Sequence, residues 1–590
     1  MSEHSIRILF FVCIIAVGLL QAFAHGTIAY STDDCSYLDQ AVLFSRFNFL
    51  EGVNFYWSPL YPFLAGLMIK CFNVPLEQQL FAVKLMNVGI LAATLIAFDY
   101  FLSKFLNFAE TLKSAENSCM PSRKQWLILS GSLFAWMFLT VGGVHQATPD
   151  YLVAAFLFLA TGLALQIDQK PTTLRFALMG VAMGFGYLAK ASMIPAAVAL
   201  IVLAAIRCPK MNVKIGNAVV ALACAVLIAS PYWSILTTKK GQFDLGSSSA
   251  MNYMLWIAKD YSLYGDNREE VENSLTHHIS ILSKRPRIAV FEDMLPATFP
   301  PWFDPGYFSD GLKIKFDFGA SLFALALNLV TLFCLFGWQL VLFYIAGRTK
   351  AKPLNISFTE VWRSSVVWLP SVLIALGICL IISLPLGFAT PRYFAANVVL
   401  IYLCYFALLR YPATDVGRRA LGLAIATACL VSLVFVSAKV VEESVRLVQK
   451  KTDLSTELAL ALNDAGLYPG DKVVFIGKEG GDWARVAGLR IVGLVESYAN
   501  EHGADDAIVL SSIVETLKTK TGAKAAIYFP EPISENLIEE ERFIQGYRDA
   551  IAAIARVKLT APPERTKFSD AALRDWRSVN GSTAYVYLLR

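Results

Sequence analysis

Long apolar stretches separated by short polar breaks dominate the chain up to about residue 440. A helix needs about 20 apolar residues to cross the roughly 30 Å hydrocarbon core of a bilayer. Eleven stretches approach this length, and we expect each to form a membrane-spanning helix. They cover residues 6–24, 80–102, 126–144, 151–167, 174–188, 192–206, 215–236, 318–346, 365–386, 393–409 and 421–440.

Four of the apolar segments need separate interpretation. The fifth and sixth stretches are short and meet at residues 189–191, so they could instead form one bent hairpin. The run 59–72 is too short to span and is expected to form a helix at the membrane interface. The first stretch ends in Ala22-Phe23-Ala24, which resembles a signal-peptidase site. Because this stretch is long for a signal peptide and hardly basic at its start, we expect it to be retained.

Lysine and arginine are concentrated in one set of alternate loops. Such basic loops stay on the cytoplasmic side of the membrane. The set carries Arg7, Lys104, Lys113, Arg123, Lys124, Lys170, Arg175, Arg207, Lys210, Lys214, Arg348, Lys350, Lys352, Arg363, Arg410, Arg418 and Arg419. The amino terminus is therefore predicted to be cytoplasmic and the carboxyl-terminal region extracytoplasmic.

We expect two domains. Residues 1–440 form a transmembrane domain with a first extracytoplasmic loop at 25–79 and a large one at 237–317. The large loop is rich in aromatic residues and prolines, and could be a lid, an acceptor-binding loop or an interfacial helix. Residues 441–590 alternate predicted helices (454–465, 505–517) with predicted strands (472–476, 523–529), which indicates an extracytoplasmic α/β domain. The glycine-rich 477–481 lacks nucleotide-binding spacing and is interpreted as a turn.

Composition agrees with a membrane protein and excludes several other classes. Hydrophobic residues make up 56% of the chain and charged residues 16%, against about 45–50% and 25% in soluble domains. The net charge of +5 is spread along the chain, which argues against nucleic-acid binding. Most cysteines lie in apolar runs, so no disulfide framework follows. His277 and His278 are adjacent and cannot share one helix face, so we predict no histidine metal site.

Ionisable residues cluster at the predicted outer ends of the spans. Charges at membrane depth are costly and often mark a site, although any one of them could simply extend to the headgroups. Together they could serve group transfer, because a carboxylate can accept the proton of an acceptor hydroxyl while cations stabilise a departing phosphate. The residues concerned are Asp33, Asp34, Lys84, Asp150, Lys190 and Arg392.

Two non-enzymatic interpretations stay open at this point. A transporter or lipid flippase would use the same residue types, but more often at the bilayer midplane in broken helices. A non-enzymatic protein of envelope assembly, with a sensing carboxyl-terminal tail, would require that tail for its function but would tolerate the loss of Asp33 and Asp34.

Two runs in the first predicted loop form a recognisable pattern: Asp33-Asp34-Cys35-Ser36-Tyr37-Leu38-Asp39-Gln40-Ala41 and Trp57-Ser58-Pro59-Leu60-Tyr61-Pro62. This pattern resembles the first extracytoplasmic loop of the GT-C glycosyltransferases, in particular protein O-mannosyltransferases and aminoarabinose transferases. The resemblance implies a polytopic α-helical GT-C-like fold. It also implies inverting transfer of a sugar from a polyprenyl-phosphate donor to a hydroxyl of a lipid, polysaccharide or protein, outside a bacterial inner membrane.

The resemblance assigns roles to residues of this chain. Asp33 matches the catalytic general base, and Asp34 matches a second acidic position that could orient the sugar or acceptor. The remaining candidates are expected to bind substrate, and they are Tyr37, Trp57, Tyr61, Lys84, Asp150, Lys190, Arg392 and Tyr393.

One departure from the family pattern shifts the expected phosphate site. Aminoarabinose transferases usually carry Lys-Pro-Pro-Leu where this chain has Trp57-Ser58-Pro59-Leu60. Lys84, Lys190 or Arg392 is therefore expected to hold the leaving phosphate. No cofactor is firmly implied. A divalent cation at the acidic pair is left open, although the resembling branches suggest catalysis without one.

Overall fold

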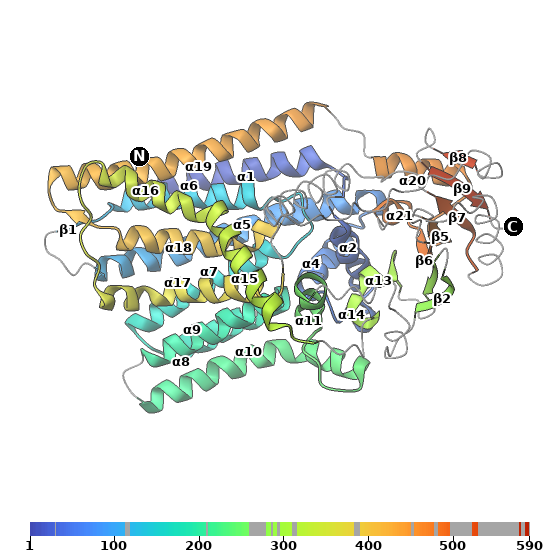
Figure 1. The fold of residues 1–590 in the computed structure, drawn as a ribbon, viewed down its shortest axis with the longest axis horizontal. Helices are drawn as coiled ribbons and strands as arrows, with labels where there is room; N and C mark the ends of the chain where they lie inside the picture. Colours follow the sequence, from blue (N-terminus) through green and yellow to red (C-terminus); the bar gives the residue numbers. More distant parts are fainter. Residues whose placement is uncertain are drawn as a thin grey trace.

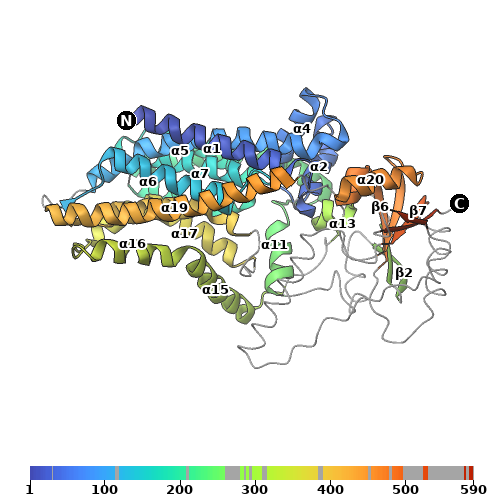
Figure 2. The same ribbon diagram turned by 90° about the horizontal axis from the view of Figure 1, so that it is seen from above.

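A bundle of long helices makes up most of the computed structural model, and a mixed sheet lies at one end of it (Figure 1). The amino terminus lies at the opposite end of the bundle from the sheet, as both views show (Figures 1 and 2). The structure describes residues 1–29, 31–112, 118–207, 211–258, 279–284, 287–291, 296–308, 315–382, 390–449, 454–476, 482–495, 522–528, 577–579 and 584–588.

Within these residues, eight helical segments are long and apolar enough to cross a membrane. They are α1 (Glu3–His25), Leu76–Thr111 with α5 (Gln79–Thr111), α7 (Asp150–Gln169), Ile215–Lys240 in α10 (Met211–Lys240), Phe318–Arg348 with α15 (Phe318–Leu332) and α16 (Trp338–Arg348), α17 (Phe358–Cys379), Pro391–Leu408 with α18 (Ala395–Leu408), and α19 (Asp415–Gln449). The chain is a polytopic α-helical membrane protein.

The other three predicted spans are also helical but shorter. They correspond to α6 (Arg123–Trp136) with η2 (Met137–Val141), α8 (Thr173–Ala189) and α9 (Ile194–Ile206). A short 3-10 turn, η3 (Ala191–Met193), separates α8 from α9, so the fifth and sixth stretches are two helices that meet at Lys190. The total of eleven spans stays a prediction.

Serine caps set the starts of two bundle helices. Ser122 precedes α6 and Ser357 precedes α17, and each exchanges hydrogen bonds with the residue three positions later, Gln125 or Glu360. This capping box satisfies amide groups that the first helical turn leaves without partners. At the other end of α1, Gly26 adopts φ of 45°, a backbone conformation that glycine tolerates best.

Small residues bring α8 close to α10. A Cβ atom at Gly180 would collide with the backbone carbonyl of Ala221, and one at Gly184 would collide with Ile228. Close backbone approach of this kind drives helix association where lipid removes the hydrophobic force between helices. The contact fixes α8 in the bundle and, with it, the position of Lys190 at the end of α8.

Short helices lie between the bundle and the sheet (Figure 1). They include α2 (Thr32–Ser45) and α4 (Leu60–Cys71), which pack on each other, with Gly66 facing the Ala41 carbonyl. Residues 59–72 thus contain the expected short apolar helix, and its location at the membrane interface stays a prediction. The segment of α13 (Pro300–Phe303) packs against α2 from the side of the sheet.

The sheet has seven described strands, which combine the carboxyl-terminal region with the large middle loop. Their order is β2 (Ile279–Lys284), β3 (Arg287–Phe291), β6 (Arg490–Val495), β5 (Lys472–Ile476), β7 (Ala525–Tyr528), β9 (Ala584–Leu588) and β8 (Arg577–Val579). β5 pairs in parallel with β6 and β7, and the other pairs are antiparallel. β2 and β3 were not expected, since the middle loop was interpreted as a lid, an acceptor loop or an interfacial helix.

Several predicted elements of the tail are present. α20 (Leu454–Asp464), β5 and β7 lie within one or two residues of their predicted positions. A short helix, α21 (Asp482–Ala487), precedes β6. The predicted helix at 505–517, the glycine-rich 477–481, and His277 and His278 lie outside the described residues.

Candidate functional site

The acidic pair occupies the first turn of α2, where the helix dipole favours negative charge. The Ser31 amide, just before the helix, donates to Asp34 Oδ2 at 3.4 Å. Consecutive helical residues are about 100° apart around the axis, since a turn holds about 3.6 residues. The two carboxylates therefore reach different partners.

Asp34 is fully buried and holds the loop between η2 and α7. Its Oδ1 accepts a hydrogen bond of 3.0 Å from the Ala147 amide. Asn87 of α5 secures the same loop by donating to the carbonyls of Val144 (3.0 Å) and Gln146 (2.7 Å). The Tyr61 hydroxyl in turn donates to Asn87 Oδ1 at 2.9 Å. Asp34 thus holds this loop directly, and Tyr61 helps to hold it through Asn87.

Asp33 faces a group of charges that comes from three other parts of the chain. Its side chain is 28% exposed, and its Oδ2 lies 3.7 Å from Arg392 Nη2. Asp150, the first residue of α7, bridges two cations, with Arg392 Nε at 2.9 Å from Oδ2 and Lys190 Nζ at 2.9 Å from Oδ1. Two cations and two carboxylates thus meet beside the start of α2.

Tyr393 adds an aromatic wall to this charged group. Lys190 Nζ lies 3.6 Å from the centre of its ring and Arg392 Cζ lies 5.1 Å away, both distances typical of cation–π contacts. Tyr393 and Arg392 share a turn, η6 (Thr390–Phe394), that leads into α18. The predicted entry to the tenth span therefore supplies both side chains.

A pocket opens at this charged group. The empty space inside it, with the open mouth included, is about 580 Å³. Its polar lining is Gln146, Thr148, Asp150, Lys190, Ser192, Arg392, Tyr393 and Asn397. Its apolar lining comes mainly from spanning helices and includes Phe138, Val153, Ala154, Leu157 and Ile374. The pocket therefore joins a charged end to an apolar wall.

The surroundings of Asp33 change its proton affinity. Burial raises the pKa of the Asp33 carboxyl above its ordinary value, although the nearby positive charges of Arg392 and Lys190 act to lower that pKa. A raised pKa strengthens a carboxylate as a proton acceptor, since the ideal pKa of a general base lies closer to the working pH. Asp33 is thus a partly exposed carboxylate with a raised pKa.

Tyr37, Trp57 and Tyr61 form an aromatic cluster next to this group. The ring centre of Tyr37 lies 4.9 Å from that of Trp57 and 5.2 Å from that of Tyr61. Trp57 Nε1 donates to the Trp302 carbonyl at 3.3 Å, and Ser36 Oγ donates to the same carbonyl at 3.1 Å. All three rings are buried, so their contacts support α2.

The Lys84 ammonium is held by backbone carbonyls. Its ammonium donates to the carbonyls of His25, Gly26 and Ile28, at 3.2, 2.9 and 2.5 Å. These carbonyls belong to the end of α1, where carbonyl groups lack helical partners and a cation is favoured. Lys84 is 1% exposed and stabilises this helix end, whereas Lys190 and Arg392 line the pocket described above.

Gln146 is a site residue that sequence reasoning missed. Its Oε1 accepts a hydrogen bond from Arg392 Nη1, and its Nε2 lies 3.4 Å from the His145 Nε2. The signal in the sequence was the polar run His145-Gln146 shortly before Asp150, in a region that is otherwise apolar. Gln146 thus holds one terminal nitrogen of the Arg392 guanidinium, and Asp33 lies near the other.

A second buried cluster ties α2 to the sheet. Arg485 of α21 places Nε 3.0 Å from Asp39 Oδ1 and donates through Nη2 to Gln79 Oε1 at 2.6 Å. The Thr298 amide donates to Asp39 Oδ2 at 2.7 Å, and the Thr298 carbonyl accepts from the Ile491 amide at 2.8 Å. The middle loop and the carboxyl-terminal region therefore both hold the helix that carries Asp33.

Groups that could bind a metal occur in two places in the described residues. The two carboxylates of the acidic pair contact different partners, Arg392 and the Ala147 amide, and a divalent cation there stays a prediction. Within the described part of the chain, His25, His145 and Glu443 form one group whose ligand atoms lie close together.

Comparison with known proteins gives similar solved structures. No family model and no curated protein matches the chain. The chain is similar to ArnT from Cupriavidus metallidurans in the apo state, with 11% identity, a TM-score of 0.39, and coverage of 100% of this chain and 99% of that one. It is also similar to the archaeal oligosaccharyltransferase AglB from Archaeoglobus fulgidus, with 13% identity, a TM-score of 0.39, and coverage of 89% and 69%.

Proposed function

We propose that this chain is an inverting glycosyltransferase that uses a polyprenyl-phosphate-linked sugar and acts on an acceptor hydroxyl at the outer face of the membrane. One observation carries the proposal. Lys190 and Arg392, both bound to Asp150, face a pocket that has Asp33 beside it and an apolar wall from spanning helices.

The two cations provide a site for the phosphate of the donor. An arginine and a lysine side by side form short charge-assisted hydrogen bonds to phosphate oxygens. Asp150 contacts both cations and holds their side chains in place. Gln146 also accepts a hydrogen bond from Arg392. The guanidinium therefore needs little rearrangement when negative charge develops on the leaving phosphate.

The apolar lining provides a site for the lipid part of the donor. Phe138, Leu157 and Ile374 line the pocket below its charged end. They come from η2, α7 and α17, two of which are candidate spans. A lipid bound along this wall would stay in the membrane while its phosphate reaches Lys190 and Arg392.

Asp33 takes the role of general base in the proposed reaction. Its carboxylate accepts the proton of the acceptor hydroxyl, and the hydroxyl oxygen forms a bond to the anomeric carbon of the sugar. The bond between that carbon and the phosphate oxygen breaks, and the electron pair leaves with the phosphate. Attack opposite to the leaving group inverts the configuration. Asp34 holds the loop that carries Gln146, so it positions the site without touching the sugar.

The location of the reaction follows from the topology that we propose. The site lies at the end of the bundle nearer the sheet, whereas the amino terminus lies at the other end (Figure 1). Basic loops place the amino terminus in the cytoplasm, which puts the site and the sheet outside. The acceptor is therefore proposed to be a lipid, glycan or protein of the cell envelope.

Donor consumption by purified protein tests this function. Wild-type protein in proteoliposomes receives a panel of radiolabelled polyprenyl-phosphate sugars together with cell-envelope fractions. We expect one donor to release free polyprenyl phosphate and to transfer its label to one fraction. A transporter would move the intact donor across the bilayer without releasing polyprenyl phosphate, and that result would overturn the proposal.

A further inference from the structure

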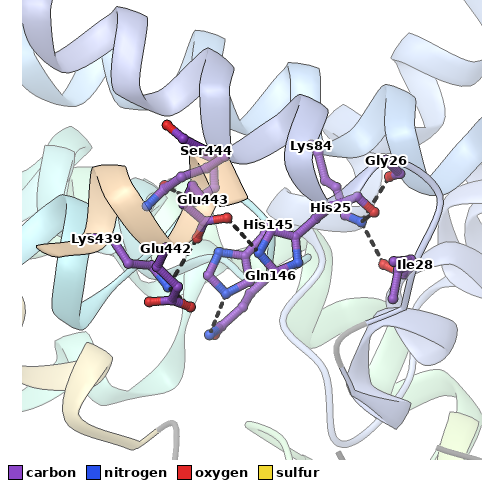
Figure 3. Close-up of polar contacts among 12 residues, drawn as sticks. His25, Gly26, Ile28, Lys84, His145, Gln146, Lys439, Glu442, Glu443 and Ser444 are labelled. Carbon is purple, nitrogen blue, oxygen red and sulfur yellow. Dashed lines mark hydrogen bonds and ion pairs between the residues drawn. The ribbon is translucent and has the colours of Figure 1, made fainter. Parts of the chain in front are cut away.

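Three potential metal ligands meet in a buried position formed by distant parts of the chain (Figure 3). His25 ends α1, His145 lies in the loop before α7, and Glu443 lies in the last turns of α19. All three side chains are buried, and one ligand atom from each lies within 4.8 Å of the others. Figure 3 shows the two imidazole rings side by side, with Glu443 reaching them from α19.

The distances suit a shared ion. His25 Nε2 and Glu443 Oε2 are 3.2 Å apart. Two ligands bonded to tetrahedral zinc at about 2.0–2.2 Å lie roughly 3.3 Å from each other. The ring centres of His25 and His145 are 4.3 Å apart and the rings are nearly parallel, at 14°. Rotation of one ring about its Cβ–Cγ bond would therefore be needed to point both nitrogens at one ion.

The two carboxylate oxygens of Glu443 have different neighbours: Lys439 contacts Oε1, and Oε2 faces His25. Lys439 contacts Glu443 Oε1 at 3.0 Å and Glu442 Oε1 at 2.9 Å, so one oxygen of Glu443 is held from the outside. Glu443 has no exposed surface. A buried carboxylate is stable only when it is paired with a cation or bound to a metal. On the other side, Gln146 contacts the His145 ring at 3.4 Å, and contacts of this kind orient histidines that bind metals.

We propose that His25, His145 and Glu443 bind one divalent transition-metal ion, with zinc as the best match. Two imidazoles and one carboxylate form a ligand set that suits zinc. Magnesium and calcium depend on several oxygen ligands and on negative charge. The neighbouring Lys84, Lys439 and Arg446 oppose ions held mainly by charge, so they favour a metal that forms strong bonds to nitrogen.

The proposed site would join three elements of the bundle. The ion would link the end of α1, the loop before α7 and the end of α19. Gln146, the neighbour of His145 in the chain, accepts a hydrogen bond from Arg392. Metal binding would therefore also steady the proposed donor site, a consequence that rests on the proposed function, whereas the metal site itself does not.

Metal content of the full-length protein tests the proposal directly. The protein is purified through an affinity tag without histidines, incubated with excess zinc and passed through a desalting column. We expect about one zinc per chain by mass spectrometry for the wild type, because the site supplies three ligands. The variants His25→Ala, His145→Ala and Glu443→Gln should each lose most of this zinc. A His277→Ala/His278→Ala double variant, which removes two histidines outside the group, should keep it.

A second measurement covers the case in which these variants fail to fold. Wild-type protein loaded with cobalt instead of zinc should show the visible absorption bands of a four-coordinate Co²⁺ ion, and zinc should displace them. The proposal is overturned if the wild type retains less than about a tenth of an ion per chain and shows no such bands, since a protein site of this kind retains its ion. It is also overturned if folded variants retain as much zinc as the wild type.

Discussion

Asp33 and Asp34 are neighbours of the same residue type, yet their surroundings differ. Asp34 is fully buried and accepts the Ala147 amide, whereas Asp33 is partly exposed and faces Arg392. The sequence resemblance predicts Asp33 as the base, and the contacts give a physical reason for that choice. A residue committed to holding a loop cannot also be free to accept a proton from substrate.

The raised pKa of Asp33 predicts the pH dependence of transfer. The base must be ionised, so activity falls as the pH drops through the pKa of Asp33. Because burial raises this pKa, the acid limb should lie above the ordinary aspartate value of about 3.9. The positive charge of Arg392 lowers the same pKa, so residual activity of Arg392→Gln should have its acid limb at a higher pH than the wild type. A pH–rate profile of both proteins measures this, and a limb that moves to lower pH in the variant would disagree.

Lys190 and Arg392 are predicted to bind the leaving phosphate. Hydrogen bonds to charged groups contribute about 1.5–3 kcal/mol, so Lys190→Gln and Arg392→Gln should each lower kcat/KM by about 10- to 100-fold. Lys104→Gln serves as the control, because Lys104 lies over the Tyr100 ring, away from the pocket lining. Steady-state kinetics with the identified donor measures the effect. Equal kcat/KM in all four proteins would remove these cations from the site.

At the scale of elements, Asp39 and Arg485 connect α2 with α21 across 446 positions of the chain. Both side chains are largely buried, at 10% and 7% exposure. Loss of one partner would leave the other charge buried without a counter-ion, which is more costly than loss of an exposed pair. The position of Asp33 therefore depends on the carboxyl-terminal region.

Arg485→Gln is predicted to destabilise the protein strongly. Breaking a buried ion pair typically costs about 3–5 kcal/mol, so the midpoint of thermal unfolding in detergent should drop clearly. The matched control is Lys524→Gln, which breaks the more exposed pair with Asp471 at 45% and 25% exposure. An exposed pair is worth about 0–1 kcal/mol, so this variant should melt close to the wild type. Equal melting of the two variants would show that the Asp39–Arg485 link does not hold α2.

The helices could be predicted from the sequence because most apolar stretches approach the length that a bilayer demands. β5 was predicted at its observed bounds, since its valine-rich run lies between turn residues. The pairing of β3 with β6 could not be predicted, because partners about 200 positions apart leave no local pattern. The backbone contacts of Lys84 could not be predicted for a similar reason. A lysine near a span end looks the same in the sequence whether it meets a phosphate or the carbonyls of another helix.

At the scale of the whole molecule, the sheet and the start of α19 lie at opposite ends of the bundle. β4 (Tyr411–Pro412), which directly precedes α19, pairs with β1 (Ser118–Cys119), and β1 lies far from the sheet in Figure 1. With basic residues concentrated in loops on one side, the end that holds the start of α19 is predicted to face the cytoplasm, and the end that holds the sheet is predicted to face the outside.

Cysteine labelling in whole cells tests this orientation. In a background without native cysteines, Tyr468→Cys near the sheet and Val416→Cys at the start of α19 provide two exposed positions, at 56% and 52% exposure. An impermeant maleimide should label position 468 in intact cells and position 416 only after permeabilisation. The reverse pattern would invert the topology and place the proposed reaction in the cytoplasm.

The site itself was predictable only in part. Asp33, Asp150, Lys190, Arg392 and Tyr393 could be selected because charged and aromatic residues at span ends are rare and conspicuous. Their mutual contacts could not be predicted, since they depend on how α2, α7, α8 and η6 pack together. The resemblance in the first loop covers Asp33 and Asp34 but not the loop before α7, so Gln146 had no counterpart in the pattern.

The most direct test of the central claim compares sugar transfer by the wild type with transfer by Asp33→Asn. Both are measured in proteoliposomes with the donor identified from the panel, and Asp415→Asn, at a position 80% exposed on α19, serves as the control. Loss of a general base should lower kcat by about 10²- to 10⁴-fold, while Asp415→Asn transfers at the wild-type rate and Asp33→Asn still binds the donor. Transfer by a folded Asp33→Asn protein at the wild-type rate would contradict the account.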